Sequence, residues 1–277
     1  MQPDSTKTEK RRGNDLSGKD WTKFSLSVWN DIKWTSEEQR LDHPAMFPTM
    51  LVERLIRCFT VETDTTVLDP FLGSGSTLVA AKHIGKSGVG FEVYEPFISL
   101  SRDRLRQDNL FAGPNVESRI INADARAMSE HIEPESVDFC VTSPPYWDIL
   151  TQKRTADYKD TRSYGNDESD LGVIHDYELF LGELQKVFSG VYRALKPGRY
   201  CVVNVMDLRK GPQFFPFHSD LARRLAELGF IFDDLIVWDR RSDYNNLRTL
   251  GYPYTFRINK IHEYLLIFLK PRLSASE

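Results

Sequence analysis

The sequence predicts an α/β protein built on one doubly wound, mostly parallel sheet of seven strands. Short apolar runs of strand character alternate along the chain with amphipathic helical patterns, which is the order of elements in such sheets. A glycine-bearing turn at 69–77 joins the first strand to the first helix. The last two strands have no helix between them, so we expect one antiparallel strand near the C-terminus.

The elements follow one another with clear boundaries. The predicted strands are 66–70, 87–93, 118–124, 136–144, 199–207, 230–238 and 263–270. The predicted helices are 76–85, 96–108, 175–196 and 218–229. Gly85 and Gly229 are helix stops, and Pro197-Gly198 follows the third helix. Residues 148–172 are polar and turn-rich, which predicts a long loop.

Composition and charge define the domain limits and the classes of protein that are excluded. Residues 1–20 are charged and poor in apolar residues, so we expect a flexible polar tail before a single domain at 21–272, and a second tail at 273–277. No apolar run reaches the roughly 20 residues that span a bilayer, and the N-terminus lacks an apolar signal core. The net charge of −4 argues against binding polyanions over the whole surface but allows one basic face.

The three cysteines, Cys58, Cys140 and Cys201, are too few and too scattered for a disulfide framework or a zinc site. We therefore expect no metal and a cytoplasmic protein in a reducing compartment.

Polar groups at three successive strand ends predict a ligand pocket, because ligands of doubly wound sheets bind at the carboxyl ends of the strands. "DPFLGSGST" (69–77) lets backbone approach a ligand closely, although a plain tight turn would also explain it. It contains no Gly-Lys-Ser/Thr and no third glycine, which argues against a P-loop and a nicotinamide-linked dehydrogenase. Glu92 is placed to accept hydrogen bonds from a ribose, and Asp124 from an adenine amino group. Together they indicate an adenosyl pocket without phosphates.

The fourth strand ends in "TSPPYW" (142–147), a stiff segment rich in acceptors. The prolines remove two N–H donors, which leaves their carbonyls and the Ser143 hydroxyl as acceptors for an amino group. Tyr146 and Trp147 offer flat faces for stacking a planar ring. A rigid turn with packed aromatics is the structural alternative.

These residues resemble the S-adenosylmethionine-dependent DNA amino-methyltransferases that act on cytosine N4 or adenine N6, over about residues 25–271. "DPFLGSGST" is similar to the cofactor motif of that family and "TSPPYW" to its catalytic motif, in the unpermuted order. "HPAMFP" (43–48) resembles the segment that closes over the methionine end of the cofactor. The resemblance implies a Rossmann-like class I methyltransferase fold with S-adenosylmethionine as cofactor. The cofactor-binding residues that it implies are Phe47, Pro48, Asp69, Phe71, Gly73, Ser74, Gly75, Glu92 and Asp124.

The resemblance also implies a reaction on a base that has been flipped out of duplex DNA. The catalytic residues would be Ser143, Pro144, Pro145 and Tyr146. The Ser143 hydroxyl and the Pro144 carbonyl would accept the two amino hydrogens, and Tyr146 would stack on the base with help from Trp147. No Pro-Cys occurs, so a C5-cytosine mechanism is excluded. Serine at the first position favours cytosine N4, with adenine N6 as the alternative.

No large target-recognition domain is visible, so loops 148–172 and 239–262 are the candidates for recognising DNA. The second carries basic residues with interleaved aromatics, which is typical of a nucleic-acid face. The candidate substrate-binding residues are Trp147, Arg240, Arg241, Asn245, Asn246 and Arg248. RNA base methylation and a non-catalytic DNA binder are the competing interpretations, and a cognate restriction endonuclease is a possible partner.

Overall fold

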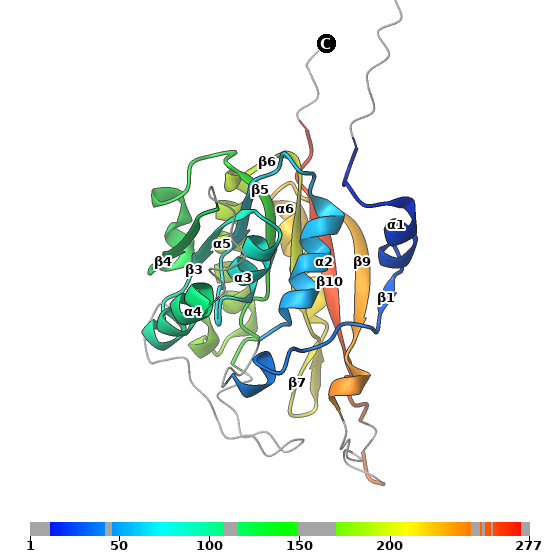
Figure 1. Cartoon of the computed structure of the whole chain (residues 1–277). Coiled ribbons are helices and arrows are strands. Elements are labelled where there is room, and N and C mark those ends of the chain that lie inside the picture. Colours follow the sequence, from blue (N-terminus) through cyan, green and yellow to red (C-terminus); the bar gives the residue numbers. More distant parts are fainter. Residues whose placement is uncertain are drawn as a thin grey trace, which may run out of the picture.

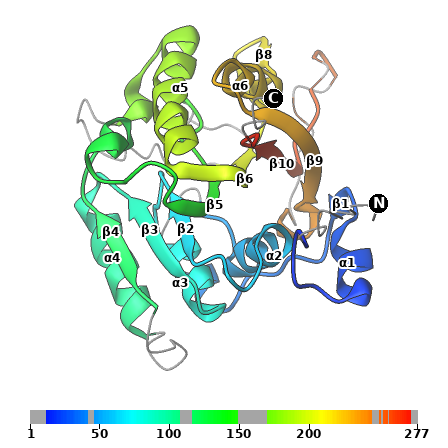
Figure 2. The ribbon, with the colours of Figure 1, turned by 90° about the horizontal axis from the view of Figure 1, so that it is seen from above.

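The computed structural model describes residues 12–41, 46–107, 116–148, 170–244, 250, 253–255 and 257–272. An eight-stranded sheet forms the centre of the molecule, with helices on both of its faces (Figures 1 and 2). The strand order is β1-β9-β10-β6-β5-β2-β3-β4. The strands are β1 (Val28–Trp29), β2 (Thr66–Asp69), β3 (Ser87–Phe91), β4 (Ser118–Ile121), β5 (Val137–Thr142), β6 (Leu195–Val205), β9 (Ile231–Asp239) and β10 (His262–Leu269).

The sheet confirms the predicted fold class. Strands β2 to β6 pair in parallel, whereas β10 runs antiparallel to both β6 and β9. Within the described central sheet, the one antiparallel strand is β10, and it lies where the missing crossover helix predicted it. The eighth strand is β1, which pairs in parallel with β9 over two residues and is too short to produce a periodic pattern in the sequence.

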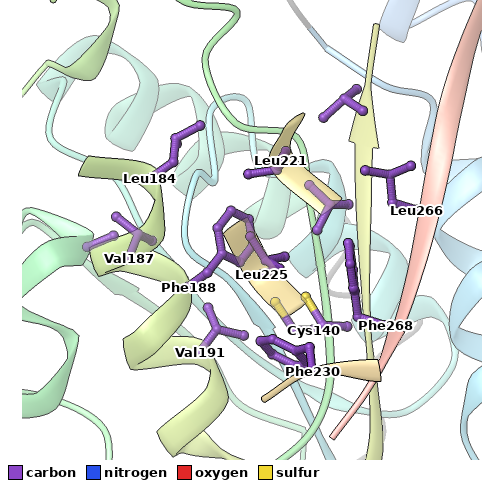
Figure 3. Close-up of a cluster of buried hydrophobic side chains, with 14 of the residues drawn as sticks. Cys140, Leu184, Val187, Phe188, Val191, Leu221, Leu225, Phe230, Leu266 and Phe268 are labelled. Carbon is purple, nitrogen blue, oxygen red and sulfur yellow. The ribbon is translucent and has the colours of Figure 1, made fainter. Parts of the chain in front are cut away.

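The helices cover the two faces of the sheet and bury one apolar cluster under each. Helices α2 (Thr49–Phe59), α3 (Ser76–His83) and α4 (Glu95–Gln107) lie on one face, and α5 (Tyr177–Ala194) and α6 (Phe217–Glu227) on the other (Figure 2). Figure 3 shows the cluster in which Phe188 of α5 and Leu225 of α6 pack toward Phe268 of β10. A second cluster joins α2 to the opposite face, around Phe139 and Trp238.

The described part of the N-terminal region is attached to the domain. Helix α1 (Gly18–Phe24) begins with Ser17 as its N-cap, and the Asn14 side chain donates to the Cys58 carbonyl at 3.1 Å. Residues 1–11 and 273–277 lie outside the described residues. Among the helices that are described, none is long and apolar enough to cross a membrane.

One two-stranded hairpin, β7 (Leu208–Lys210) with β8 (Gln213–Phe215), has no counterpart in the sequence prediction. Its strands have three residues each and its sequence, "LRKGPQFF", shows neither alternation nor a long apolar run. It lies at the same end of the molecule as the turn after β9 (Figure 1).

Candidate active site

A pocket of about 860 Å³, including its open mouth, lies at the carboxyl ends of β2, β3, β4 and β5. Its wall is formed by residues 46–47, 70–74, 91–93, 123–125, 143–145 and 170–171, together with Ser76. The wall carries three carboxylates, Glu92, Asp124 and Asp170, and its described residues include no lysine, arginine or histidine. This charge suits a cationic ligand without phosphates.

Asp69 connects the glycine loop to the catalytic segment from beneath the pocket. It is 0% exposed and accepts hydrogen bonds from Thr77 Oγ1 at 2.6 Å, Thr142 Oγ1 at 2.6 Å and the Phe71 N–H at 3.0 Å. Burial raises the pKa of Asp69 to about 6, and these three hydrogen bonds oppose the rise. Asp69 does not line the pocket, so its place in the structure is that of a clamp between β2, α3 and β5.

The glycine loop requires its glycines for backbone geometry. Gly73 and Gly75 have φ angles of 53° and 84°. A Cβ atom on Gly75 would lie 2.8 Å from Ser101 Oγ and 3.2 Å from its Cα, so α4 leaves no room for a side chain. Ser101 Oγ donates to the Gly73 carbonyl at 2.8 Å, and Arg104 of α4 donates to the Ser74 carbonyl at 2.8 Å. Helix α4 therefore fixes the shape of the loop.

Glu92 holds the other side of the same loop. Its Oε2 accepts from the Gly73 N–H at 2.9 Å, and its Oε1 accepts from the Val93 and Tyr94 N–H groups at 2.9 and 2.8 Å. Burial raises the pKa of Glu92, while the three N–H donors oppose the shift. A carboxylate oriented by three backbone donors at the pocket wall is a rigid acceptor for ligand hydroxyl groups.

Asp124 lines the pocket but already has strong partners. It caps the short helix η3 (Ala125–Glu130) by accepting from the Arg126 N–H at 2.8 Å, and it pairs with the Arg126 guanidinium at 2.5 Å. Arg126 also reaches Glu183 at 2.7 Å. Any contact of Asp124 with a ligand would therefore use the remaining lone pairs of its oxygens.

The segment expected to close over the cofactor is positioned by Glu38, which the sequence interpretation missed. The buried Glu38 accepts from Thr49 N and Oγ1 at 2.7 and 2.6 Å, at the start of α2. Phe47 lines the pocket, whereas Pro48 does not. Residues 42–45, which include the first part of the "HPAMFP" motif, lie outside the described residues.

The catalytic segment follows β5 directly. Ser143, Pro144 and Pro145 line the same pocket as the glycine loop and Glu92. Ser143 Oγ lies 3.3 Å from the Tyr146 hydroxyl. The structure thus brings the predicted acceptors to the wall of the predicted cofactor pocket.

A buried polar network holds Tyr146. Its hydroxyl donates to Glu263 Oε2 at 3.1 Å, and Glu263 also accepts from the Asn204 amide and from the Arg240 guanidinium. Burial, together with the nearby Glu263 carboxylate, raises the pKa of Tyr146 well above its usual range, so the phenol stays neutral. Glu263 is the first buried side chain of β10 and fixes the phenol from below.

Trp147 is placed for packing. It is 4% exposed, has a φ of 52°, and its ring lies 5.2 Å from Tyr177 and 5.0 Å from Phe215 between centroids. The Lys210 ammonium lies 4.1 Å from the Trp147 ring centroid. Other side chains enclose this ring, so Trp147 supports the segment that bears Tyr146. The structure therefore gives Trp147 a packing contact in place of the stacking on a base that we expected.

The candidate DNA-contacting residues separate into two groups. Arg240 bonds Glu263 and Asp243 and stacks on Trp238 at 4.8 Å, so it belongs to the network under Tyr146 and not to a free basic face. The Arg241 side chain is 75% exposed and lies 3.7 Å from Asp239. Asn245, Asn246 and Arg248 lie outside the described residues, as does nearly all of the loop 148–172.

Several site residues escaped the sequence interpretation: Glu38, Arg104, Asp170, Asn204 and Glu263. Asn204 and Glu263 carried a usable signal, because each is a polar residue within or at the start of an otherwise apolar strand. Glu38, Arg104 and Asp170 lie in polar stretches where a buried residue looks like a solvated one.

The sheet order, the glycine loop and the acidic pocket define an S-adenosylmethionine-dependent methyltransferase fold. The chain matches the DNA methylase family (N6_N4_Mtase) over residues 1–103 and 137–274, and it belongs to that family. The cofactor of the family, S-adenosylmethionine, fits the pocket, because three carboxylates and no basic side chain among the described lining residues suit a sulfonium cation.

Two curated relatives are Type II methyltransferases. M.MjaI of Methanocaldococcus jannaschii is 32% identical over 168 residues, which cover 55% of each chain. M.ScaI of Streptomyces caespitosus is 36% identical over 111 residues, which cover 38% of this chain and 34% of the relative. The matched segments thus span from about a third to about half of these relatives.

Two solved structures are also similar, and both come from Thermus thermophilus. TrmN shares the fold at 17% identity, with a TM-score of 0.50 over 81% of this chain and 49% of that chain. TTHA0409, solved in complex with S-adenosyl-L-methionine, is 31% identical, with a TM-score of 0.39 over 56% of each chain.

Proposed function

We propose that this chain transfers the methyl group of S-adenosylmethionine to the exocyclic N4 of a cytosine flipped out of duplex DNA. The observation that carries the proposal is the shared pocket: Ser143 and Pro144 line the same cavity as the glycine loop and Glu92. An amino group bound by the first pair would meet a methyl donor held by the second. Orienting two reactants in this way supplies a large part of the rate of such reactions.

The polar groups of the catalytic segment orient the amino nitrogen. In our proposal the Ser143 hydroxyl and the Pro144 carbonyl accept the two amino hydrogens. These hydrogen bonds turn the nitrogen lone pair out of conjugation with the ring and toward the pocket. The released proton leaves to water through the open mouth, and no covalent enzyme intermediate is required.

Tyr146 supplies the face on which the base lies. Because its hydroxyl is bound to Glu263 and its phenol is neutral, the ring presents an uncharged surface in one orientation. A stacked aromatic contact with a base contributes about 1–3 kcal/mol, which offsets part of the cost of flipping it.

The chain's own residues would hold the cofactor from three sides. Glu92 would accept from the ribose hydroxyls, the Gly73 loop would lie against the cofactor backbone, and Phe47 would cover the methionine end. When bound, S-adenosylmethionine would supply an electrophilic methyl group, whose bond to sulfur would break as the bond to the amino nitrogen forms, so that the sulfur would leave as a neutral thioether.

The choice of cytosine rests on Ser143, because the resemblance associates serine at this position with N4 methylation. We extend the proposal to a restriction–modification pair, since the curated relatives are Type II methyltransferases. Loops 148–172 and 239–262 would read the target, with Arg241 as an exposed cation of the second loop.

Incubation with S-adenosylmethionine labelled in its methyl group, and with either plasmid DNA or RNA, tests the proposal. We expect label in DNA, recovered as N4-methylcytosine after digestion to nucleosides. Ser143→Ala and Tyr146→Ala should abolish transfer while cofactor binding stays near normal. Label only in RNA would overturn the proposal, and label at adenine N6 would overturn the assignment of the base.

A further inference from the structure

The hairpin formed by β7 and β8 carries a basic surface that the proposed catalytic residues do not use. Its turn is tied to the C-terminal part of the second candidate recognition loop (239–262), because the Arg257 guanidinium donates to the Gly211 carbonyl at 2.9 Å. Residues 208–215 and 257–262 contain four cations and no aspartate or glutamate, in a chain of net charge −4. This region is therefore a local positive surface on an acidic protein.

Three of these cations have no acidic partner among the described residues. No carboxylate of the described residues lies within ion-pairing distance of Arg209, Arg257 or Lys260, whereas the Lys210 ammonium pairs with Asp148 at 2.5 Å. We call Arg209, Arg257, Lys260 and the ring of Phe214 the hairpin surface. Unpaired cations grouped on one face favour binding to a polyanion.

The arrangement around Phe214 indicates which kind of polyanion this surface would bind. The ring is 40% exposed, and Arg209 Cζ and Lys260 Nζ lie 5.6 and 5.0 Å from its centroid. Arg209 also donates to the Pro212 carbonyl at 2.9 Å, which restrains its side chain. Cations held beside an exposed aromatic ring suit the alternating phosphate and sugar–base character of a nucleic acid.

The hairpin is joined directly to the catalytic segment. The Phe215 ring packs at 5.0 Å from Trp147, the residue after Tyr146. Lys210 places its ammonium 4.1 Å from the Trp147 ring and 2.5 Å from Asp148. A ligand bound on the hairpin surface would therefore lie on an element that packs against the segment expected to hold the base.

We propose that Arg209 and Lys260 bind backbone phosphates of duplex DNA beside the flipped base. This inference rests on the proposed function and adds a surface to it. Phosphate contacts fix the position of a protein on the duplex without reading its sequence, so the role is independent of the recognition sequence.

The salt dependence of duplex binding tests the inference, because each phosphate contact contributes about −0.9 to the slope of log K against log salt concentration. A fluorescent duplex of random sequence is sufficient, and anisotropy gives the affinity over a series of NaCl concentrations. Replacing both Arg209 and Lys260 by alanine should make the slope shallower by about 2 and weaken binding at every salt concentration.

Two matched variants separate charge from packing. The charge-preserving pair Arg209→Lys with Lys260→Arg should keep the wild-type slope. The pair Lys19→Ala with Arg57→Ala removes two exposed cations, one from α1 and one from the last turn of α2, and should also keep the wild-type slope. Unchanged S-adenosylmethionine affinity in all variants verifies their fold.

The outcomes distinguish this inference from the proposed function. A wild-type slope in the double alanine variant would overturn the inference that Arg209 and Lys260 bind phosphates. It would not bear on the proposed DNA methylation, which the labelling experiment tests separately. Failure of the wild-type protein to bind duplex DNA overturns both. Binding of single-stranded RNA but not of duplex DNA, with the slope lost in the double variant, overturns duplex DNA as the ligand.

Discussion

Replacing Asp69 by asparagine tests whether a buried carboxylate clamps the glycine loop to the catalytic segment. Asparagine keeps the size and one acceptor oxygen, but it places an amide nitrogen opposite one of the two threonine hydroxyls. Disturbing one buried hydrogen bond costs about 1–2 kcal/mol at any pH. What distinguishes the wild-type protein from this variant is the pH dependence of its free energy of unfolding, which the Asp69 carboxylate adds and asparagine does not.

The sign follows from the raised pKa. The pKa of Asp69 rises from 3.8 to about 6 in the folded state, so the folded protein binds the proton more tightly than the unfolded chain does. The stabilisation is fully present below about pH 4 and is lost as the pH rises through about 6, by about 3 kcal/mol in total. About 1.4 kcal/mol of this loss falls between about pH 5 and about pH 8.

Urea unfolding at these two pH values measures the effect. The free-energy advantage of the wild-type protein over Asp69→Asn should be about 1.4 kcal/mol larger near pH 5 than near pH 8, because the other titrating groups cancel in the comparison. Equal differences at both pH values would refute a buried, proton-binding Asp69.

Asp138→Asn is the matched control. Burial opposes the shift, but the Lys196 ammonium and the N–H groups of Thr65 and Thr66 lower the pKa of Asp138 below 3.8. This carboxylate therefore stays ionised over the whole range, and its replacement should cost the same free energy near pH 5 and near pH 8.

Three further predictions concern the pocket and the network beneath it. Gly75→Ala should lower the free energy of unfolding by about 1–3 kcal/mol, because both its φ of 84° and the crowding from α4 oppose a side chain, whereas Gly182→Ala in the open interior of α5 should not destabilise. Equal urea midpoints for both variants would contradict this. Glu263→Gln should lower kcat about tenfold with an unchanged KM for S-adenosylmethionine, since it loosens the network that holds Tyr146, whose other members Asn204 and Arg240 do not line the pocket; a change in KM alone would point to the cofactor pocket instead. Glu92→Gln should weaken S-adenosylmethionine binding at least about tenfold in calorimetry, because an amide nitrogen would face backbone N–H donors; wild-type affinity would exclude Glu92 from the cofactor site.

The sequence was sufficient for seven of the eight strands of the described sheet and for the edge of the sheet at which the pocket lies. Strand periodicity, the glycine loop and the missing final helix depend on local patterns, and the sheet follows from them. The sequence was not sufficient to tell which polar residues line the pocket and which hold the structure together. Asp69 and Glu92 are both acidic residues at the ends of predicted strands, and the sequence does not distinguish them. Only Glu92 lines the pocket, because the Asp69 carboxylate accepts hydrogen bonds from Thr77 and Thr142.

Non-local contacts explain the remaining differences. Arg240 looks like part of a basic face in its own segment, yet its partner Glu263 lies on the neighbouring strand β10. Trp147 looks available for stacking until the hairpin is folded against it. Neither contact can be read from spacing along the chain, because each joins segments that are separated by a turn or a whole element.

The most direct test of the central claim is sequencing of DNA from cells that express this protein, with a method that reports both 4-methylcytosine and 6-methyladenine. We predict 4-methylcytosine at one recurring sequence, and its loss in cells that express Ser143→Ala instead. DNA with neither modification, from cells in which the wild-type protein is folded and binds S-adenosylmethionine, would contradict the claim that "TSPPYW" presents a DNA base to the methyl donor.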